Sequence, residues 1–211
     1  MNQLAFIWDL DGTLVDSYPA IVPAVRDAFA EQGLTLDEAW IHEEVIRSSV
    51  ADLIRRVSAA EGLDAAAAQA AFARRNDGCV EAIVPMPHAA ETLDALARAG
   101  HRNFVCTHRG ASCPAILART GLAPFFTEVV TALAGFPRKP APDAIRYLLE
   151  KYALDPSRSY YVGDRSLDVE AAENAGIGSI LYLDPASPGR PTGRESHLVR
   201  DLLEIPALAE K

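Results

Sequence analysis

Hydrophobic positions divide the chain into two kinds of pattern. Residues 4–8 form an uninterrupted apolar run, which is typical of a strand covered on both faces of a parallel sheet. Between Ser17 and Val84 no strand pattern appears, and apolar residues recur at helical spacing instead. The predicted helices there are AIVPAVRDAFAEQG, DEAWIHEEVIRSS, VADLIRRVSAAEG and DAAAAQAAFARRNDGCVEAI.

From residue 85 onward, helical and strand patterns alternate. The predicted strands are RNFVCT, EVVTA, SYYVGD and SILYLD, each preceded by an amphipathic helix. The segment PASPGRPTGRES is expected to be irregular, and a short last helix is expected in LVRDLLEI. This alternation predicts an α/β fold with right-handed crossovers. We therefore expect a Rossmann-like, three-layer parallel-sheet core from residues 1–15 and 85–211. A small all-α helical bundle, residues 16–84, would be inserted after the first strand.

Composition narrows the class of protein. The chain has 211 residues, of which 49% are hydrophobic and 23% charged, as in ordinary soluble globular proteins. Its net charge of -9 argues against a surface for nucleic acid or anionic membranes. The three cysteines form no C-x-x-C pair, which favours a reducing compartment. The chain shows neither a basic leader nor an apolar run that could span a bilayer, so we expect a cytoplasmic protein.

The end of the first predicted strand carries an unusual group of residues. Asp9 and Asp11 are two positions apart, so they begin on the same face of the strand. Gly12 allows the backbone to turn close to a ligand, and Thr13 adds a hydroxyl. An ordinary Asp-Gly turn would explain Asp11 and Gly12 but not Asp9.

Polar residues also follow the later strands. Thr107, His108 and Arg109 end the second strand, Lys139 follows the third, and Gly163, Asp164 and Asp168 follow the fourth. Taken singly, Asp164 reads as a helix N-cap, Lys139 as a surface lysine and Asp168 as a first-turn charge. Because the carboxyl ends of parallel strands meet at one edge, we expect all of them to gather there.

This set of side chains has a chemical meaning. Several carboxylates at one edge suit a hard cation in an incomplete protein cage, which favours Mg²⁺. A hydroxyl with backbone N–H groups near a helix start suits a phosphate, and a lysine adds positive charge. Together they indicate phosphoryl transfer, in which catalysis is mostly positioning and charge stabilisation.

The motifs DLDGTLVDS, VCTHR, RKPAPD and YVGDRSLDVEAAENAG carry a resemblance to a known family. In this order, they resemble the four motifs of the haloacid dehalogenase superfamily, in its phosphoglycolate-phosphatase-like branch. The resemblance covers the whole chain, and the helical insert resembles the family's C1-type cap. It implies a catalytic α/β core in residues 1–15 and 85–211 and a cap in residues 16–84.

The resemblance also implies roles for individual residues. Asp9 would be the nucleophile, and Asp11 the general acid and then the base. Mg²⁺ would be held by the carboxylates of Asp9 and Asp164 and the backbone carbonyl of Asp11. Thr107 and Lys139 would bind phosphoryl oxygens, with Gly12, Thr13, His108 and Arg109 also lining the phosphate and substrate site. Asp168 would support the metal's water or Lys139.

Three residues depart from the family pattern, and one cap residue is a further candidate. His108 stands where many relatives carry Asn, Arg109 follows it, and Arg165 follows Asp164. Such a histidine is more often part of a pocket wall than a catalytic base. Arg47, at an expected bend between cap helices, would either reach a substrate anion or form a surface salt bridge.

The resulting hypothesis is an Mg²⁺-dependent phosphatase that acts on a small phosphorylated metabolite through an aspartyl-phosphate. The alternatives are a phosphomutase similar to β-phosphoglucomutase and a non-catalytic binding or regulatory protein of the same fold. A dehalogenase is disfavoured because it needs neither Asp11 nor Mg²⁺. A phosphonatase is disfavoured because the segment 16–84 contains no lysine for a Schiff base. The motifs leave the metabolite and the oligomeric state open.

Overall fold

A computed structural model describes residues 3–185 and 187–209. The chain divides into two compact units: one contains the chain up to Asp16 and from Val84 onward, and the other is Ser17–Ile83. Both crossings between the units lie at a short antiparallel pair, in which Val15 pairs with Pro85 and Asp16 with Val84. The sequence did not predict this pair, because two-residue strands have no measurable periodicity.

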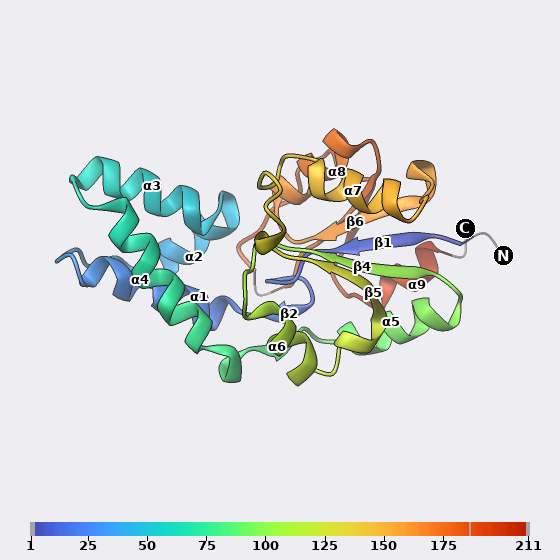
Figure 1. The fold of residues 1–211 in the computed structure, drawn as a ribbon, viewed down its shortest axis with the longest axis horizontal. Helices are drawn as coiled ribbons and strands as arrows, with labels where there is room; N and C mark the ends of the chain where they lie inside the picture. The colour runs from blue at the N-terminus through green and yellow to red at the C-terminus, as the bar shows by residue number, and fades with distance from the viewer. Residues whose placement is uncertain (1–2, 186, 210–211) are drawn as a thin grey trace. The chain divides into compact units, whose positions relative to one another are not determined.

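The larger unit is built on a parallel sheet, which confirms the predicted α/β fold class (Figure 1). Its strands are β1 (Ala5–Trp8), β4 (Arg102–Cys106), β5 (Phe126–Val130), β6 (Ser159–Gly163), β7 (Gly178–Tyr182) and β8 (His197–Val199). The strand order is β5-β4-β1-β6-β7-β8, and each neighbouring pair is parallel. The antiparallel pair beside it is formed by β2 (Val15–Asp16) and β3 (Val84–Pro85).

Helices cover both faces of this sheet, which gives three layers (Figure 1). The α-helices of this unit are α5 (Ala89–Arg98), α6 (Cys113–Arg119), α7 (Asp143–Lys151), α8 (Ser166–Ala175) and α9 (Glu204–Leu208). Helices α7 and α8 lie on one face, and α5, α6 and α9 lie on the other. Short 3₁₀ turns occur at Ala123–Phe125, Ala132–Ala134 and Pro156–Arg158.

Strand β1 is the centre of the core because it is buried on both faces, as its apolar run predicted. Ile7 packs in a cluster with Phe104 and Tyr161 of the neighbouring strands and with Leu148 of α7. On the other face, Trp8 is fully buried, and its Nε1 donates a hydrogen bond to Asn103 Oδ1 at 3.0 Å. Full burial of each such apolar side chain contributes roughly 1.5–3 kcal/mol of transfer free energy.

The order of the strands determines where a ligand can bind. The chain builds β1, β4 and β5 outward in one direction, and then returns to place β6, β7 and β8 on the other side of β1. The order therefore reverses beside β1, and ligands of such sheets bind outside the carboxyl ends of the strands at this switch point. Asp9 is the first residue after β1.

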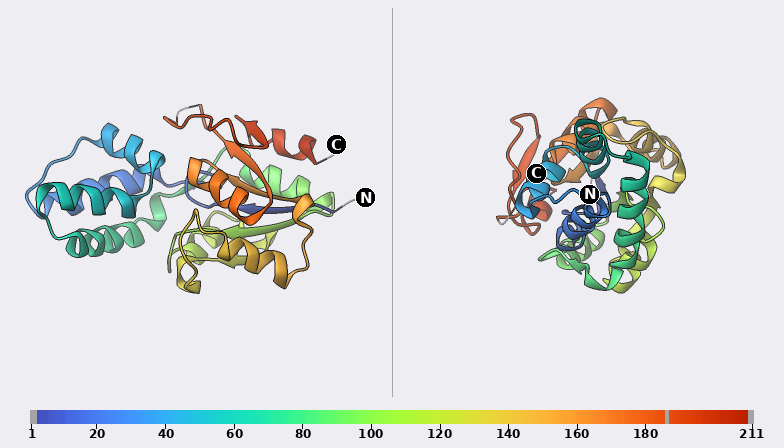
Figure 2. Two further views of the ribbon diagram at one scale, coloured as in Figure 1. Left: turned by 90° about the horizontal axis from the view of Figure 1, so that it is seen from above. Right: turned by 90° about the vertical axis from the view of Figure 1, so that its left-hand side faces the viewer.

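The smaller unit is a bundle of α1 (Tyr18–Ala30), α2 (Glu38–Arg47), α3 (Val50–Glu61) and α4 (Ala65–Gly78), followed by a 3₁₀ turn at Val80–Ala82 (Figure 2). Polar side chains fix where three of these helices begin. Asp37, Ser49 and Asp64 accept backbone N–H groups of the first turns of α2, α3 and α4. Its core contains Val25 and Phe29 of α1 with Leu53 of α3 and other apolar side chains.

One predicted element is wrong. The helix expected at residues 198–205 begins only at Glu204, and His197–Val199 instead form β8, which pairs in parallel with β7. The leucine spacing there fits a helix, but pairing with β7 satisfies backbone groups that would otherwise remain at the sheet edge. In the part of the chain that the structure describes, no helix combines the length and hydropathy needed to cross a bilayer.

Candidate active site

The turn after β1 brings two predicted site residues into hydrogen bonds. Gly12 has φ 79°, a left-handed conformation that favours glycine, and its N–H donates to Val15 O at 2.9 Å. Thr13 Oγ1 donates to Asp164 Oδ1 at 3.1 Å, although 151 positions separate the two residues. Asp9 is 1% exposed, and its Oδ1 accepts the N–H of Leu10 at 2.8 Å.

Lys139 binds two carboxylates at the centre of the site. Its Nζ lies 2.8 Å from Asp9 Oδ2, 2.6 Å from Asp168 Oδ1 and 2.9 Å from the Tyr161 hydroxyl. That hydroxyl donates in turn to the backbone oxygen of Cys106 at 2.6 Å. Burial alone would lower the pKa of Lys139, but Asp168 and Asp9 outweigh it and raise that pKa above its ordinary value. The lysine is therefore a fixed, buried cation.

The same charges keep Asp9 ionised. Burial would raise the pKa of Asp9, but Lys139 and Arg165 outweigh it and hold that pKa below its usual range. Arg165 Nη2 lies 3.0 Å from Asp9 Oδ2, so two cations contact a single oxygen of this carboxylate. A buried carboxylate that stays an anion at neutral pH has the protonation state that a nucleophile requires.

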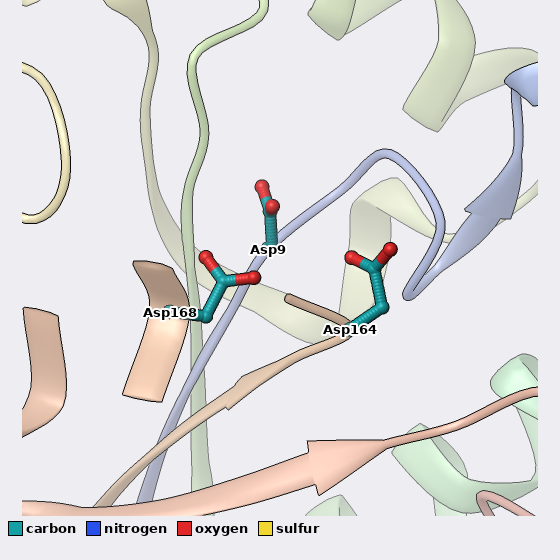
Figure 3. Close-up of side chains that lie close together, drawn as sticks. All are labelled: Asp9, Asp164 and Asp168. Atoms are coloured by element: carbon teal, nitrogen blue, oxygen red, sulfur yellow. The ribbon is translucent and has the colours of Figure 1, made fainter. Parts of the chain in front are cut away.

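Three buried carboxylates, those of Asp9, Asp164 and Asp168, form a group that fits a hard divalent cation (Figure 3). Each offers one oxygen, and these oxygens lie within 4.8 Å of one another. Gly163 permits this approach, because a Cβ there would lie 2.4 Å from Asp168 Cβ. An all-oxygen donor set with few protein ligands suits Mg²⁺. The sequence-based metal set contained Asp11 in place of Asp168, with Asp11 contributing its backbone carbonyl.

The Asp11 carboxylate is bound by Arg109. Arg109 Nε lies 2.9 Å from Asp11 Oδ1 and 3.1 Å from Oδ2, and Nη2 lies 2.7 Å from Oδ1. The arginine side chain is 1% exposed, whereas that of Asp11 is 18% exposed. Arg109 N–H also donates to Thr107 Oγ1 at 3.1 Å, which ties the arginine to the end of β4. The loop after β4 therefore fixes the orientation of the Asp11 side chain.

His108 lies in the wall of a small cavity and contacts the backbone of Lys139. Its Nε2 accepts the backbone N–H of Lys139 at 2.7 Å. Burial, then the positive charges of Lys139 and Arg138, lower the pKa of His108 to about 2, so the imidazole is neutral. Its Nδ1 is buried and finds no hydrogen-bond partner among residues 3–185 and 187–209. The ring borders a cavity of about 60 Å³ beside the loop that carries Lys139.

The site residues that the sequence predicted in the larger unit thus lie at one edge of its sheet. The remaining candidate, Arg47, belongs to the smaller unit. Arg47 is the last residue of α2, its side chain is 69% exposed, and it forms an ion pair with Glu44. Glu44 is 7% exposed and also binds Arg56 at 2.6 Å. Arg47 therefore forms a salt bridge with Glu44 within the smaller unit, which is one of the two roles that the sequence suggested for it.

Sequence reasoning missed two residues as members of the site. Arg165 was noted as a departure from the family pattern, without a role, yet its guanidinium contacts Asp9. Tyr161 was treated as part of a buried strand, yet its hydroxyl binds Lys139. The position of Tyr161, three residues before Asp164 on a strand leading to the site, was the available signal. Nothing in the sequence indicated that its hydroxyl meets Lys139.

The sequence matches a family of hydrolases and is similar to curated phosphatases. The sequence model for haloacid dehalogenase-like hydrolases matches residues 6–182. The phosphoglycolate phosphatase of Rhodospirillum rubrum is 36% identical over 190 residues, which cover 84% of this chain and 78% of that protein. The plasmid-encoded phosphoglycolate phosphatase of Cupriavidus necator is 34% identical, covering 97% of this chain and 92% of the relative.

Solved structures share the fold. CbbY from Rhodobacter sphaeroides, crystallised with phosphate, has a TM-score of 0.81 at 22% identity and covers 97% of this chain and 96% of its own. A predicted phosphoglycolate phosphatase from Haemophilus somnus has a TM-score of 0.84 at 21% identity, and the match covers 98% of this chain and 97% of that chain. The family match covers all four motifs and reaches from β1 to β7. The chain therefore belongs to the haloacid dehalogenase-like hydrolases, as its motifs predicted.

Proposed function

We propose that this protein is an Mg²⁺-dependent phosphatase that hydrolyses a small phosphorylated metabolite, of the phosphoglycolate kind, through an aspartyl-phosphate on Asp9. The observation that carries the proposal is the environment of Asp9. This buried carboxylate stands at the switch point of the sheet and stays ionised. Its Oδ2 forms an ion pair with Lys139 Nζ at 2.8 Å. The phosphatases of R. rubrum and C. necator support the enzyme class and the kind of substrate.

The reaction that we propose gives these residues the roles that the family resemblance implies for them. Asp9 attacks phosphorus, and the bond between phosphorus and the leaving alcohol oxygen breaks as the aspartyl-phosphate forms. Asp11 enters the reaction in its protonated form and gives its proton to that oxygen. As a carboxylate it then takes a proton back from the water that attacks phosphorus and releases inorganic phosphate. Lys139 and the Thr107 hydroxyl bind the phosphoryl oxygens. Mg²⁺ held by Asp9, Asp164 and the Asp11 carbonyl would neutralise charge on the phosphoryl group.

The structure of the site supports a small anionic substrate rather than a polymer. The cations of the site are buried and paired, and the chain as a whole carries a net charge of -9. That charge disfavours nucleic acid, whose binding needs an extended basic surface. We place the enzyme in the cytoplasm, in agreement with its free cysteines Cys79, Cys106 and Cys113.

The direct test is release of inorganic phosphate from a panel of phosphomonoesters that includes phosphoglycolate and p-nitrophenyl phosphate. We expect turnover with Mg²⁺ and none after chelation with EDTA. Asp164→Ala should lower the rate and weaken the response to Mg²⁺ together. Full activity after exhaustive chelation would contradict the proposed metal, and isomerised product without phosphate release would identify a mutase.

The nucleophile is tested separately. Asp9→Asn is nearly isosteric but cannot attack phosphorus as an anion, so we expect loss of activity with the fold retained. Asp94→Asn, on α5, is the matched control and should keep full activity. BeF₃⁻ should form its adduct on Asp9, and an adduct elsewhere or turnover by Asp9→Asn would refute the assignment.

A further inference from the structure

The backbone of Lys139 is held by side chains from other parts of the larger unit. Lys139 lies in the segment 135–142, which belongs to neither a helix nor a strand. Its backbone N–H donates to His108 Nε2 at 2.7 Å, although 31 positions separate the two residues. The oxygen of the next residue, Pro140, accepts a hydrogen bond from Asn174 of α8 at 2.9 Å. The position of the lysine therefore depends on contacts that its own segment does not supply.

The contact from His108 needs a neutral imidazole. A ring nitrogen accepts a hydrogen bond only when it carries no proton, so Nε2 is the acceptor and Nδ1 carries the proton. Burial and the positive charges of Lys139 and Arg138 keep the pKa of His108 far below its ordinary value, so the ring stays neutral at physiological pH. A charged imidazole would instead point an N–H at the backbone N–H of Lys139.

The backbone on both sides of His108 is itself fixed. Thr107 N–H donates to Val130 O at 2.9 Å, and Arg109 O accepts the N–H of Ala132 at 3.0 Å. These two bonds attach the end of β4 to the end of β5 and to the turn that follows it. His108 is therefore a rigid link between the edge of the sheet and the segment that carries Lys139.

The lysine side chain has contacts that tolerate little displacement. Its Nζ lies 2.6 Å from Asp168 Oδ1, 2.8 Å from Asp9 Oδ2 and 2.9 Å from the Tyr161 hydroxyl. Two of these partners, Asp9 and Asp168, are drawn in Figure 3. A shift of about 1 Å in a group that binds the reacting atoms can lower a rate by about 100-fold. The contact that fixes the lysine backbone therefore bears on the chemistry of the site.

We propose that His108 is a positioning residue of the phosphatase reaction: its Nε2 holds the backbone of Lys139, so that the lysine Nζ meets Asp9 and the phosphoryl group in one fixed place. This inference rests on the proposed function. It makes His108 act through Lys139 and not on the substrate. Because the proposed function gives Lys139 its role in stabilising the transition state, loss of the contact should lower kcat and change KM little.

Three substitutions of His108 separate its two ring nitrogens. Glutamine places an amide oxygen near the position of Nε2, asparagine ends near the position of Nδ1, and methionine offers no comparable acceptor. With p-nitrophenyl phosphate, we expect kcat to fall by about 10- to 100-fold in His108→Met and His108→Asn, with KM within about threefold. In His108→Gln, kcat should recover to within about threefold of the unmodified protein, since the acceptor is restored.

The control is Thr131→Val, which removes another side-chain acceptor from the wall of the same cavity. Thr131 Oγ1 accepts the N–H of Leu133 at 3.3 Å and does not hold Lys139, so this variant should keep the kcat of the unmodified protein. Circular dichroism checks the fold of each variant, and His108→Asn and His108→Met replace one another if either does not fold.

NMR tests the contact itself, independently of activity. Hydrogen exchange of the Lys139 amide should be about tenfold faster in His108→Met and His108→Asn than in the unmodified protein, and His108→Gln should restore its protection. In the unmodified protein, ¹⁵N spectra should show a His108 ring protonated at Nδ1 alone from about pH 8 to about pH 5, on both sides of the ordinary histidine pKa of about 6.5.

Several results would overturn the inference. If His108→Asn keeps kcat and His108→Gln loses it, the ring acts through Nδ1 and not through Lys139. An equal kcat in all folded variants, or an equal loss that glutamine does not reverse, would also refute the role, as would a ring protonated at Nε2. Failure of the proposed function has a different signature: the unmodified protein would release phosphate from no phosphomonoester, while exchange of the Lys139 amide would still respond to the substitutions.

Discussion

Arg109 donates two hydrogen bonds to one oxygen of Asp11, from Nη2 to Oδ1 at 2.7 Å and from Nε to Oδ1 at 2.9 Å, although 98 positions separate the two residues. The arginine is buried and its backbone is held as well, since Arg109 O accepts the N–H of Ala132 at 3.0 Å. The contact therefore joins the loop after β1 to the loop after β4. It determines the direction of the side chain to which the proposed mechanism gives both proton transfers.

Arg109→Lys separates the geometry of this contact from its charge. Lysine keeps the positive charge but lacks the planar fork that holds a carboxylate at two points. We expect kcat/KM for alkyl phosphates to fall by roughly tenfold, while that for p-nitrophenyl phosphate changes little, because nitrophenolate departs without a proton. Steady-state kinetics on both substrates measure the difference. Arg102→Lys, at the opposite end of β4, is the control, and an equal fall for both substrates would contradict a positioning role.

Tyr161→Phe tests how Lys139 is held. The hydroxyl accepts a hydrogen bond from Lys139 and donates one to the buried Cys106 carbonyl, so its removal leaves both partners short of a contact. We expect a loss of about 1–3 kcal/mol in the free energy of unfolding, measured with urea, and a lower kcat. Tyr160→Phe, the neighbouring residue on β6, should leave kcat unchanged. A Tyr161→Phe variant with unaltered stability and kcat would show that the contact contributes nothing.

The neutral state of His108 predicts how stability depends on pH. Its pKa is about 2 in the fold and about 6.5 when the chain is unfolded, so below pH 6.5 the unfolded state binds a proton that the folded state does not. Stability must therefore fall as the pH decreases from 6.5, by about 1.4 kcal/mol per pH unit for this group.

Replacing His108 should remove that contribution. Between pH 6.5 and 4.5 we expect the unmodified protein to lose roughly 2–3 kcal/mol more stability than His108→Asn does, from urea unfolding at each pH. His197→Gln should retain the steeper dependence. Parallel curves for the unmodified protein and His108→Asn would show that the histidine is not kept neutral by the fold.

Arg47 tests whether the helical unit Ser17–Ile83 contributes to substrate choice, as the sequence-based hypothesis of a cap requires. If Arg47 binds the leaving group, Arg47→Ala should change the ranking of kcat/KM across acidic and neutral phosphomonoesters while Mg²⁺ affinity stays the same. Arg55→Ala is the matched control, because both side chains are 69% exposed and both pair with an acidic residue on their own helix. A uniform change across all substrates would remove Arg47 from substrate recognition.

Much of the fold followed from the sequence, because its signals are local. The apolar run before Asp9, the alternation after residue 85 and the helical spacing before it correspond to strand β1, to the α/β sheet and to α1–α4. The helix expected at 198–205 failed because pairing of Leu198 and Val199 with β7 is a long-range effect that leucine spacing does not contain. The antiparallel pair β2–β3 was missed because strands of two residues are too short to show a periodicity.

At the candidate site, the sequence by itself determined which residues could come together: Asp9, Thr107, Lys139 and Asp164 each follow a strand, and parallel strands end at one edge. Only the tertiary structure decided how they are paired. It turned the Asp11 side chain to Arg109, joined Asp168 to the carboxylates near Asp9, and set Arg165 on Asp9. The direction of a side chain and the charge of a buried group depend on neighbours distant in sequence and on the exclusion of water, and neither is encoded in the spacing of residues.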